Sequence, residues 1–401
     1  MNKALAALSF GLAILATQTA RAQAPAADEL RRETIAFIEL SDDPRYEPLR
    51  AYERLILKTR GHPFPGAQIG VDEALPLKRV LKTEFALERM SVKSEADFGT
   101  AIKAAADKGL HYLLVDAPAS AWTDIAAAAK GRDVLLFNVS APEDTLRRDL
   151  CAREVVHAMP SRAQLMDGLV QFLVSKKWRD YLILEGPEPK DAEMTKAFLR
   201  SAQKFGARIV AQQKFEPGND PRNREKNNPA LLSAINKDWD VTFVADNAFD
   251  FTREISYRTI KPRPVVGSID LEPVAWSWVW EHNGAPQVNS RFAKFAADRK
   301  MESADWAAWI SVKMIVQAAL RTKSSDFATQ RDFILGPGNF DGDKGLAVSV
   351  RPWDHQLRQA ILLAAPYSIV ASAPLEGFLH RLNELDTLGD DQPETPCRLD
   401  K

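Results

Sequence analysis

The histidines and cysteines of the chain are the first residues to search for catalytic chemistry. No two histidines form an H-x-x-x-H pair, and no histidine joins a cysteine at the spacing of a zinc site. The chain contains no G-x-S-x-G motif, no P-loop and no G-x-G-x-x-G loop. Asp341–Gly345 resembles the start of a calcium loop, but its glycine comes too early and position twelve is Pro352, which favours a turn. We therefore expect a binding protein, not an enzyme, without a catalytic cofactor or a metal site.

Tryptophan is the residue type that stands out, with nine Trp against six Tyr. Indole rings can stack on a flat ligand, so their positions along the chain matter. Trp122 follows a predicted strand, and Trp306 lies near the start of a predicted helix. Trp276, Trp278 and Trp280 alternate, so an extended backbone would place all three on one face, as a ligand platform or as a seam between lobes. These five tryptophans are the aromatic candidates for ligand contact.

Cations and hydrogen-bond donors near strand ends complete the candidate binding site. Arg162 follows Pro160-Ser161 at a predicted helix start, where backbone N–H groups also favour anions. Arg45 follows the first strand, and Arg253 follows a later one. The polar candidates at strand ends are Ser120, Asn138, Ser140 and Asn247.

Alternating strands and helices must position these residues. Short apolar runs predict strands at 34–39, 84–88, 110–115 and 134–138, and again at 180–184, 207–213, 240–245 and 264–267. Helical segments lie between them, including one at 251–258, which predicts an α/β protein with two doubly wound parallel-sheet lobes. The rhythm changes after residue 270, where helices at 286–298 and 303–321 and strands at 346–350 and 358–363 are expected to complete the two sheets.

This pattern predicts a domain order with several crossings between the lobes. Residues 23–150 plus about 275–330 would form lobe 1, and about 151–274 plus about 331–365 would form lobe 2, joined by a multi-strand hinge. Residues 366–401 would form a C-terminal extension. Ligands of open parallel sheets bind at the carboxyl ends of the strands, so we expect the site between the lobes.

The first 22 residues indicate export. Lys3 precedes an apolar run that ends in Ala20-Arg21-Ala22, the pattern of a cleaved signal peptide, so we expect a periplasmic protein. Without Lys3 and Arg21, 51 of the 53 basic residues remain against 54 acidic ones, a net charge of −3 that argues against nucleic-acid binding. In an oxidising compartment the two cysteines, Cys151 and Cys397, suggest a disulfide. We expect a monomer.

Two blocks of sequence resemble a known family. The stretch Asn138–Arg147, Cys151 and His157–Asp167 running into Lys177-Trp178-Arg179, together with Glu384–Asp391 and Cys397-Arg398, resembles the solute-binding proteins of ABC transporters linked to pyrroloquinoline quinone (PQQ)-dependent alcohol dehydrogenases. The resemblance implies a type I periplasmic binding fold, PQQ as the bound ligand, an ABC permease as partner, and a link to a PQQ-dependent dehydrogenase.

Two alternatives to PQQ remain open. The protein could bind an amino acid or another small carboxylate, although Trp122 would crowd a pocket sized for leucine. It could instead be a periplasmic partner of a quinoprotein alcohol dehydrogenase that holds no free ligand. PQQ itself, a flat tricarboxylate, would require aromatic faces and a few well-placed arginines, because the overall charge supplies no general attraction.

Overall fold

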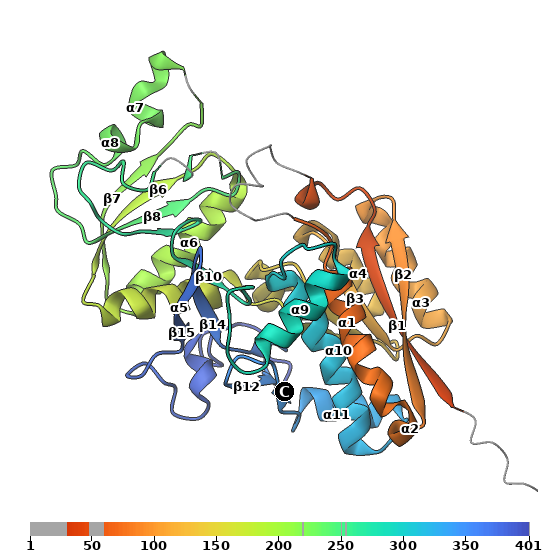
Figure 1. Ribbon diagram of the computed structural model, residues 1–401. Coiled ribbons are helices and arrows are strands. Elements are labelled where there is room, and N and C mark those ends of the chain that lie inside the picture. Colours follow the sequence, from red (N-terminus) through yellow and green to blue (C-terminus); the bar gives the residue numbers. More distant parts are fainter. Residues whose placement is uncertain (1–29, 48–59, 219, 250, 253–254, 401) are drawn as a thin grey trace, which may run out of the picture.

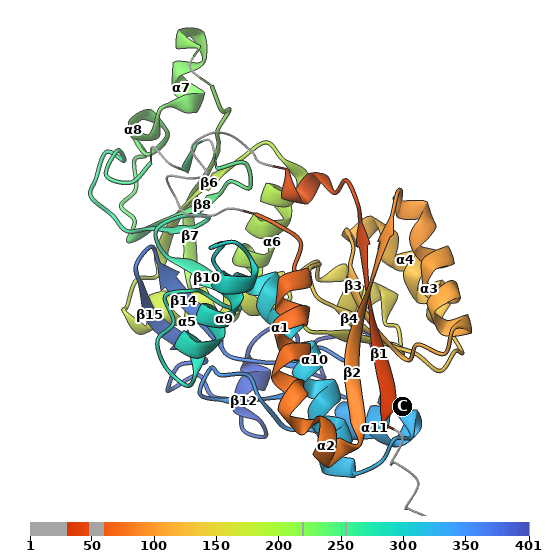
Figure 2. The same ribbon diagram turned by 45° about the vertical axis from the view of Figure 1, so that its right-hand side comes forward.

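Two parallel β-sheets form the centres of two lobes in the computed structural model (Figures 1 and 2). The structure describes residues 30–47, 60–218, 220–249, 251–252 and 255–400. The predicted α/β architecture with two parallel-sheet lobes is confirmed. The predicted signal peptide lies outside the described residues. Within the described part of the chain, no helix is both long and apolar enough to cross a membrane.

The sheet of lobe 1 has five parallel strands in the order β2-β1-β3-β4-β5. The strands are β1 (Arg31–Leu40), β2 (Thr83–Val92), β3 (Tyr112–Asp116), β4 (Leu135–Asn138) and β5 (Val155–His157). Successive side chains of the interior strand β1 enter opposite cores, with Ile35 and Phe37 on one face and Ala36 and Ile38 on the other. A strand buried on both faces appears in the sequence as the continuous apolar run that predicted it.

Helices cover both faces of this sheet. One core contains α1 (Phe64–Ala74), α9 (Ala285–Phe295), α10 (Ser303–Thr322) and α11 (Phe327–Leu335), and the short α2 (Lys78–Leu81) lies before β2. The other core contains α3 (Phe98–Asp107) and α4 (Trp122–Ala129). The predicted return of 286–298 and 303–321 to the first sheet therefore agrees with the packing of α9 and α10.

Lobe 2 has a four-stranded parallel sheet in the order β7-β6-β8-β9. Its strands are β6 (Asp180–Glu185), β7 (Arg208–Lys214), β8 (Val241–Ala245) and β9 (Val265–Gly267), and its helices are α5 (Arg162–Ser175), α6 (Pro189–Lys204), α7 (Arg224–Asn227) and α8 (Pro229–Leu232). The predicted helix at 251–258 is wrong for the residues that are described, since Ile255–Arg258 form turns.

The late segments divide between the lobes differently from the prediction. We expected 331–365 in lobe 2, but Ile334, Phe340 and Val350 lie in the core of lobe 1. These residues belong to α11 and to the antiparallel strands β11 (Phe340–Asp341), β12 (Ala347–Val350) and β13 (Leu357–Arg358). The chain crosses to lobe 2 only at β14 (Ile361–Ala365), which pairs with β10 (Glu272–Val274) and β15 (Ser368–Ala373).

A buried lysine joins the three crossings between the lobes. The Lys344 Nζ donates to the carbonyl oxygen of Ala275 at 3.0 Å, to that of Ala360 at 2.7 Å and to the Gln359 Oε1 at 2.9 Å. The Gln359 amide in turn donates to the Ala158 carbonyl oxygen at 2.9 Å. Since these carbonyls belong to the first, second and third crossing, one polar network fixes their relative positions.

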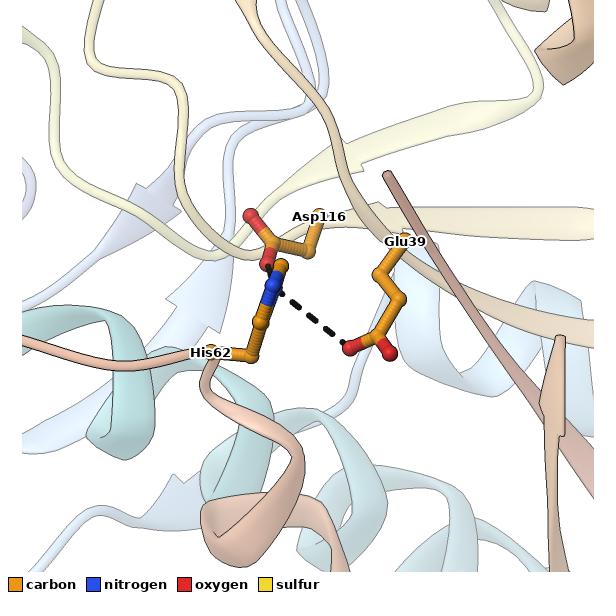
Figure 3. Close-up of side chains that lie close together, drawn as sticks. All are labelled: Glu39, His62 and Asp116. Atoms are coloured by element: carbon orange, nitrogen blue, oxygen red, sulfur yellow. Dashed lines mark hydrogen bonds and ion pairs between the residues drawn. The ribbon is translucent and has the colours of Figure 1, made fainter. Parts of the chain in front are cut away.

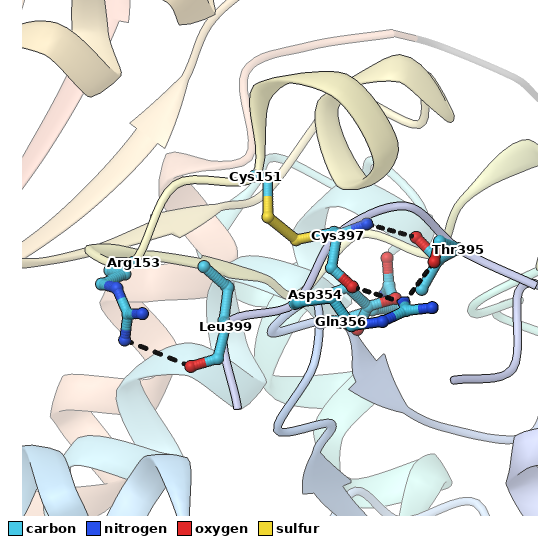
Figure 4. Close-up of a disulfide and its surroundings, with 8 residues drawn as sticks. Cys151, Arg153, Asp354, Gln356, Thr395, Cys397 and Leu399 are labelled. Carbon is cyan, nitrogen blue, oxygen red and sulfur yellow. Dashed lines mark hydrogen bonds between the residues drawn. A yellow bond between two sulfur atoms is a disulfide. The ribbon is translucent and has the colours of Figure 1, made fainter. Parts of the chain in front are cut away.

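The C-terminal extension contacts both lobes. The Cys151–Cys397 disulfide links its end to the segment before β5, which confirms the predicted pairing in this structure (Figure 4). Beside it, the Arg153 guanidinium donates to the Leu399 carbonyl oxygen at 3.2 Å. On lobe 2, the Lys204 Nζ reaches Asp167 and the carbonyl oxygen of Gly389, both at 2.9 Å. The extension thus spans both lobes on the hinge side of the molecule, and we call it the strap.

Candidate functional site at the carboxyl edge of lobe 1

Three ionisable side chains meet at the carboxyl edge of the lobe 1 sheet (Figure 3). Glu39 lies near the end of β1, and Asp116 is its direct register partner at the end of β3. His62 lies two residues before α1. Because parallel strands end at the same edge, the topology brings together two carboxylates that are far apart in sequence.

The imidazole of His62 lies between the two carboxylates. Its Nδ1 is 2.8 Å from the Asp116 Oδ2 and 3.4 Å from the Glu39 Oε2. Both acids are almost fully buried, with exposed fractions of 2% for Glu39 and 0% for Asp116. Buried carboxylates require charged or hydrogen-bonded partners, and the cluster supplies them.

Arg45 holds the other oxygen of Asp116. Its Nη2 lies 2.8 Å from the Asp116 Oδ1, and the Tyr46 hydroxyl donates to the same oxygen at 2.8 Å. The Arg45 Nε pairs with Asp43, and its Nη1 donates to the Ser140 Oγ at 3.0 Å. The guanidinium therefore joins the ends of three strands, and its donors are used within the protein.

These contacts shift the pKa values of the cluster. Burial alone would raise the pKa of Asp116, but the His62 hydrogen bond and the Arg45 charge outweigh it and hold that pKa below its usual value. For Arg45, burial acts to lower the pKa, and the charge of Asp116 with the other acids raises it overall. Burial, with Asp116 as a second cause, raises the pKa of Tyr46 well above its usual value. Asp116 is therefore ionised at neutral pH.

Glu39 has one oxygen held and one oxygen open. Its Oε1 accepts from the Arg89 Nε at 2.6 Å and from the Ser91 hydroxyl at 3.1 Å. Its Oε2 is buried and has no hydrogen-bond partner among the described residues. Such an oxygen carries a desolvation cost unless something else binds it.

The corresponding edge of lobe 2 faces this cluster and touches lobe 1. Asp246 and Asn247 follow β8, and the Asn247 amide donates to the Asp191 Oδ1 at 2.7 Å. From lobe 1, the Arg60 Nη2 donates to the Asn247 carbonyl oxygen at 3.3 Å, and its guanidinium lies 5.4 Å from the ring centroid of Phe249. Arg60 thus connects the two strand-end edges.

Comparisons with known proteins agree with this two-lobed architecture. No protein-family model and no curated protein matches the chain. Among solved structures, a branched-chain amino acid ABC transporter periplasmic ligand-binding protein from Burkholderia xenovorans LB400 matches with a TM-score of 0.67 at 14% identity, over 92% of this chain and 100% of that one. A leucine-, isoleucine-, valine-, threonine- and alanine-binding protein from Brucella ovis, in a closed conformation, matches with a TM-score of 0.64 at 13% identity, over 86% and 95%.

A third solved structure is similar over nearly the whole chain. It is a solute-binding protein of an ABC transporter from R. palustris in complex with benzoate, with a TM-score of 0.61 at 10% identity, over 91% of this chain and 99% of that one. The chain has the type I periplasmic binding protein fold. In this fold the strand-end edges with Glu39, Asp116 and Asn247 belong to facing lobes.

Within the type I periplasmic binding protein fold, the predicted polar residues have different positions. Arg45 and Ser140 belong to the Asp116 cluster, and Asn247 lies on the facing edge. Asn138 is buried and bonds the Ala141 carbonyl oxygen, while Ser120 bonds Glu95 at the surface. Asn138 and Ser120 thus make structural contacts here.

The two remaining predicted arginines lie elsewhere. Arg162 begins α5 and lies 3.3 Å from Glu143 of lobe 1 and 3.2 Å from Glu193 of lobe 2. It is therefore an ion-pair bridge near the first crossing. Arg253 lies outside the described residues.

The five candidate tryptophans have different environments in this structure. Trp122 and Trp306 have exposed fractions of 0%, and Trp276 of 2%, so none of the three presents an open ring face. The expected extended run is wrong, because residues after β10 turn at Ser277–Trp280. Trp280 bonds the Asp343 carbonyl oxygen, and Trp278 lies beneath Lys300. The two cores of lobe 1 therefore enclose Trp122, Trp276 and Trp306, while Trp278 and Trp280 are partly exposed.

Sequence reasoning missed the acidic half of the site. Glu39, Asp43, Tyr46, His62 and Asp116 were not among the candidates, although Glu39 ends one predicted strand and Asp116 directly follows another. An acid at the end of a buried apolar strand was the available signal. His62 carried no such signal, since only the fold brings it to these acids.

Proposed function

We propose that the protein is a solute-binding protein of an ABC transporter, which closes its two lobes around a small solute that bears a carboxylate. The observation that supports the proposal is the facing pair of strand-end edges, one with the buried Glu39–His62–Asp116 cluster and the other joined to it by Arg60. Type I neighbours that carry amino acids or benzoate in their descriptions fit this class of solute. A periplasmic location is part of the proposal, supported by the same neighbours and by the signal peptide predicted from the sequence.

Arg60 is the residue we assign to the solute carboxylate. The donors of Arg45 are committed to Asp43, Asp116, Ser140 and Ala117, so that guanidinium positions the cluster. Arg60 lies between the edges beside the Phe249 ring, where a guanidinium can pair with a carboxylate and an aromatic face can cover a flat solute. A charge-assisted bond of this kind contributes about 1.5–3 kcal/mol.

Within this class, PQQ is the solute we propose to test first. The support is the resemblance of the Asn138–Asp167 and C-terminal blocks to the PQQ-linked binding proteins. The same resemblance suggests an ABC permease as partner and a functional link to a PQQ-dependent dehydrogenase. PQQ carries three carboxylates on a flat ring system, which matches a site of arginine beside an aromatic side chain.

Titration calorimetry with PQQ, leucine and benzoate tests the proposal. One-to-one saturation by any of them supports a solute-binding protein, and saturation by PQQ alone supports the finer assignment. Arg60→Met should weaken binding by roughly tenfold or more. Arg222→Met is the matched control, because that exposed arginine pairs with Asp220, two residues before it, and with no other acid among the described residues. Absence of binding to all three, with co-purification of a quinoprotein dehydrogenase, would favour the docking alternative instead.

A further inference from the structure

Three side chains of the carboxyl-edge cluster bring potential metal ligands close together. One ligand atom from each of Glu39, His62 and Asp116 lies within 4.8 Å of the other two. The His62 Nδ1 is paired with the Glu39 Oε2 and the Asp116 Oδ2. Two of the separations, 2.8 Å and 3.4 Å, are those expected between neighbouring ligand atoms at about 2.1 Å from one metal ion. Each residue contributes one donor atom from a different segment of lobe 1, so the fold itself assembles the set.

The other atoms of the same side chains are already held. Arg89 and Ser91 hold the second oxygen of Glu39, and Arg45 and Tyr46 hold the second oxygen of Asp116. Contacts of this kind orient metal ligands, because they fix each carboxylate and leave one oxygen directed inward. The cluster therefore has its supporting hydrogen bonds in place.

An unpartnered buried atom points independently to a bound cation. The Oε2 of Glu39, on a side chain that is 98% buried, accepts no hydrogen bond in the described part of the chain. His62 has one Nδ1 and uses it at the shorter distance for Asp116. A single proton on that nitrogen cannot satisfy both carboxylates well, whereas a metal ion can bind all three atoms at once.

The net charge of the cluster is also compatible with a bound divalent ion. The carboxylates of Glu39, Asp43 and Asp116 face the guanidinium groups of Arg45 and Arg89, which leaves a formal charge of −1 with His62 neutral. A divalent ion would change this to +1. The resulting positive charge would attract one carboxylate of a solute. This consequence rests on the proposed function.

We propose that Glu39, His62 and Asp116 form a binding site for a divalent transition-metal ion in lobe 1. One imidazole nitrogen with two carboxylate oxygens suits Zn²⁺ or Mn²⁺, while Ca²⁺ and Mg²⁺ prefer oxygen ligands alone. Three protein ligands leave coordination positions for water or a solute carboxylate.

Calorimetry on the chelator-treated, solute-free full chain tests this site. We expect one Zn²⁺ or Mn²⁺ per chain, weaker binding of Ca²⁺, and a loss of at least about tenfold in affinity for both His62→Gln and Glu39→Gln. His380→Gln is the matched control, because His380 also lies 3.4 Å from a carboxylate, that of Asp391, but has no second acid in the described contacts. Its affinity should equal that of the natural chain.

Two results would overturn the proposal: no saturable binding of either metal, or unchanged affinity in both cluster variants. Thermal unfolding without metal shows whether each variant folds. If only one variant folds, its metal affinity alone decides whether the proposal holds. Solute titration with and without chelator separates this proposal from the previous one. If the chain binds metal but none of the solutes, the cation site is supported and the proposed function fails. If the chain binds a solute equally with and without chelator and binds no metal, the cation site is excluded and the proposed function stands.

Discussion

The Lys344 Nζ lies 3.6 Å from the ring centroid of Trp306, enclosed beneath the crossings between the lobes. Burial lowers the pKa of Lys344 well below its usual value. Within the described part of the chain no carboxylate pairs with it, so three carbonyl oxygens and the indole face stand in for water around the amine.

Removing this amine should destabilise the hinge. Lys344→Met keeps most of the side-chain volume but leaves buried carbonyl oxygens of Ala275 and Ala360 without this donor, a cost of about 2–4 kcal/mol. Chemical denaturation measures the loss. Lys313→Met is the control, because that lysine is more exposed and pairs with Asp343 at the rim of the same region. Equal losses for both variants would contradict the special role of Lys344.

The disulfide should contribute measurably to stability. Cys151 and Cys397 are separated by 246 residues, and a link that closes so long a loop restricts the unfolded chain. We expect reductant to lower the free energy of unfolding by about 2–4 kcal/mol. Thermal unfolding with and without reductant checks this. A Cys151→Ala, Cys397→Ala variant should already be less stable, and reductant should leave it unchanged.

His355 should make the protein sensitive to acid. Burial lowers its pKa from 6.5 to about 4, so between these pH values the unfolded chain binds a proton that the folded chain does not. Stability from this group is therefore present above pH 6.5 and lost as the pH falls towards 4, on the order of 3 kcal/mol in total.

A variant isolates this contribution from opposing groups. Burial raises the pKa of the neighbouring Asp354 to about 6, which acts in the opposite direction as the pH falls. His355→Asn tolerates the positive φ of 52° at this position and removes only the histidine. Denaturation at pH 7 and pH 4.5 should show a smaller acid-induced loss in the variant. Parallel pH profiles for the two proteins would contradict the assignment.

Trp122 should act through the core of lobe 1. It is fully buried beside Ile125 and Leu136, so Trp122→Ala leaves a cavity that costs about 3–5 kcal/mol. Denaturation should show this loss, while the solute affinity of the folded fraction stays unchanged. A clear loss of affinity at full folding would restore stacking on Trp122 as a ligand contact.

The sequence predicted most strands of the two parallel sheets, because strands such as β3 and β8 are buried apolar runs. Leu110–Val115 and Asp240–Ala245 were placed within about two residues of β3 and β8. The site was harder, since its chemistry depends on non-local contacts. Arg45 and Ser140 followed from their positions after strands, whereas His62 reaches Asp116 from a turn 54 residues away.

The tryptophans show a second limit of sequence-based prediction, because they were expected at the ligand site and several lie in the core. Periodicity placed Trp276, Trp278 and Trp280 on one face, but a turn at Ser277–Trp280 replaces the extended run, and Trp276 bonds Asn289 within the core. A large indole near a sheet edge can complete a core or face a solute. Only the packing of the whole lobe decides between them.

The strap has a topological consequence. The backbone from Cys151 through all of lobe 2 and back to Cys397 forms a closed covalent ring with its link at the sulfur atoms. A protease that cuts at the exposed Arg224 or Lys226 of α7 opens the ring without separating it. Under oxidising conditions the nicked protein would still migrate as one chain, and two fragments would appear only after reduction.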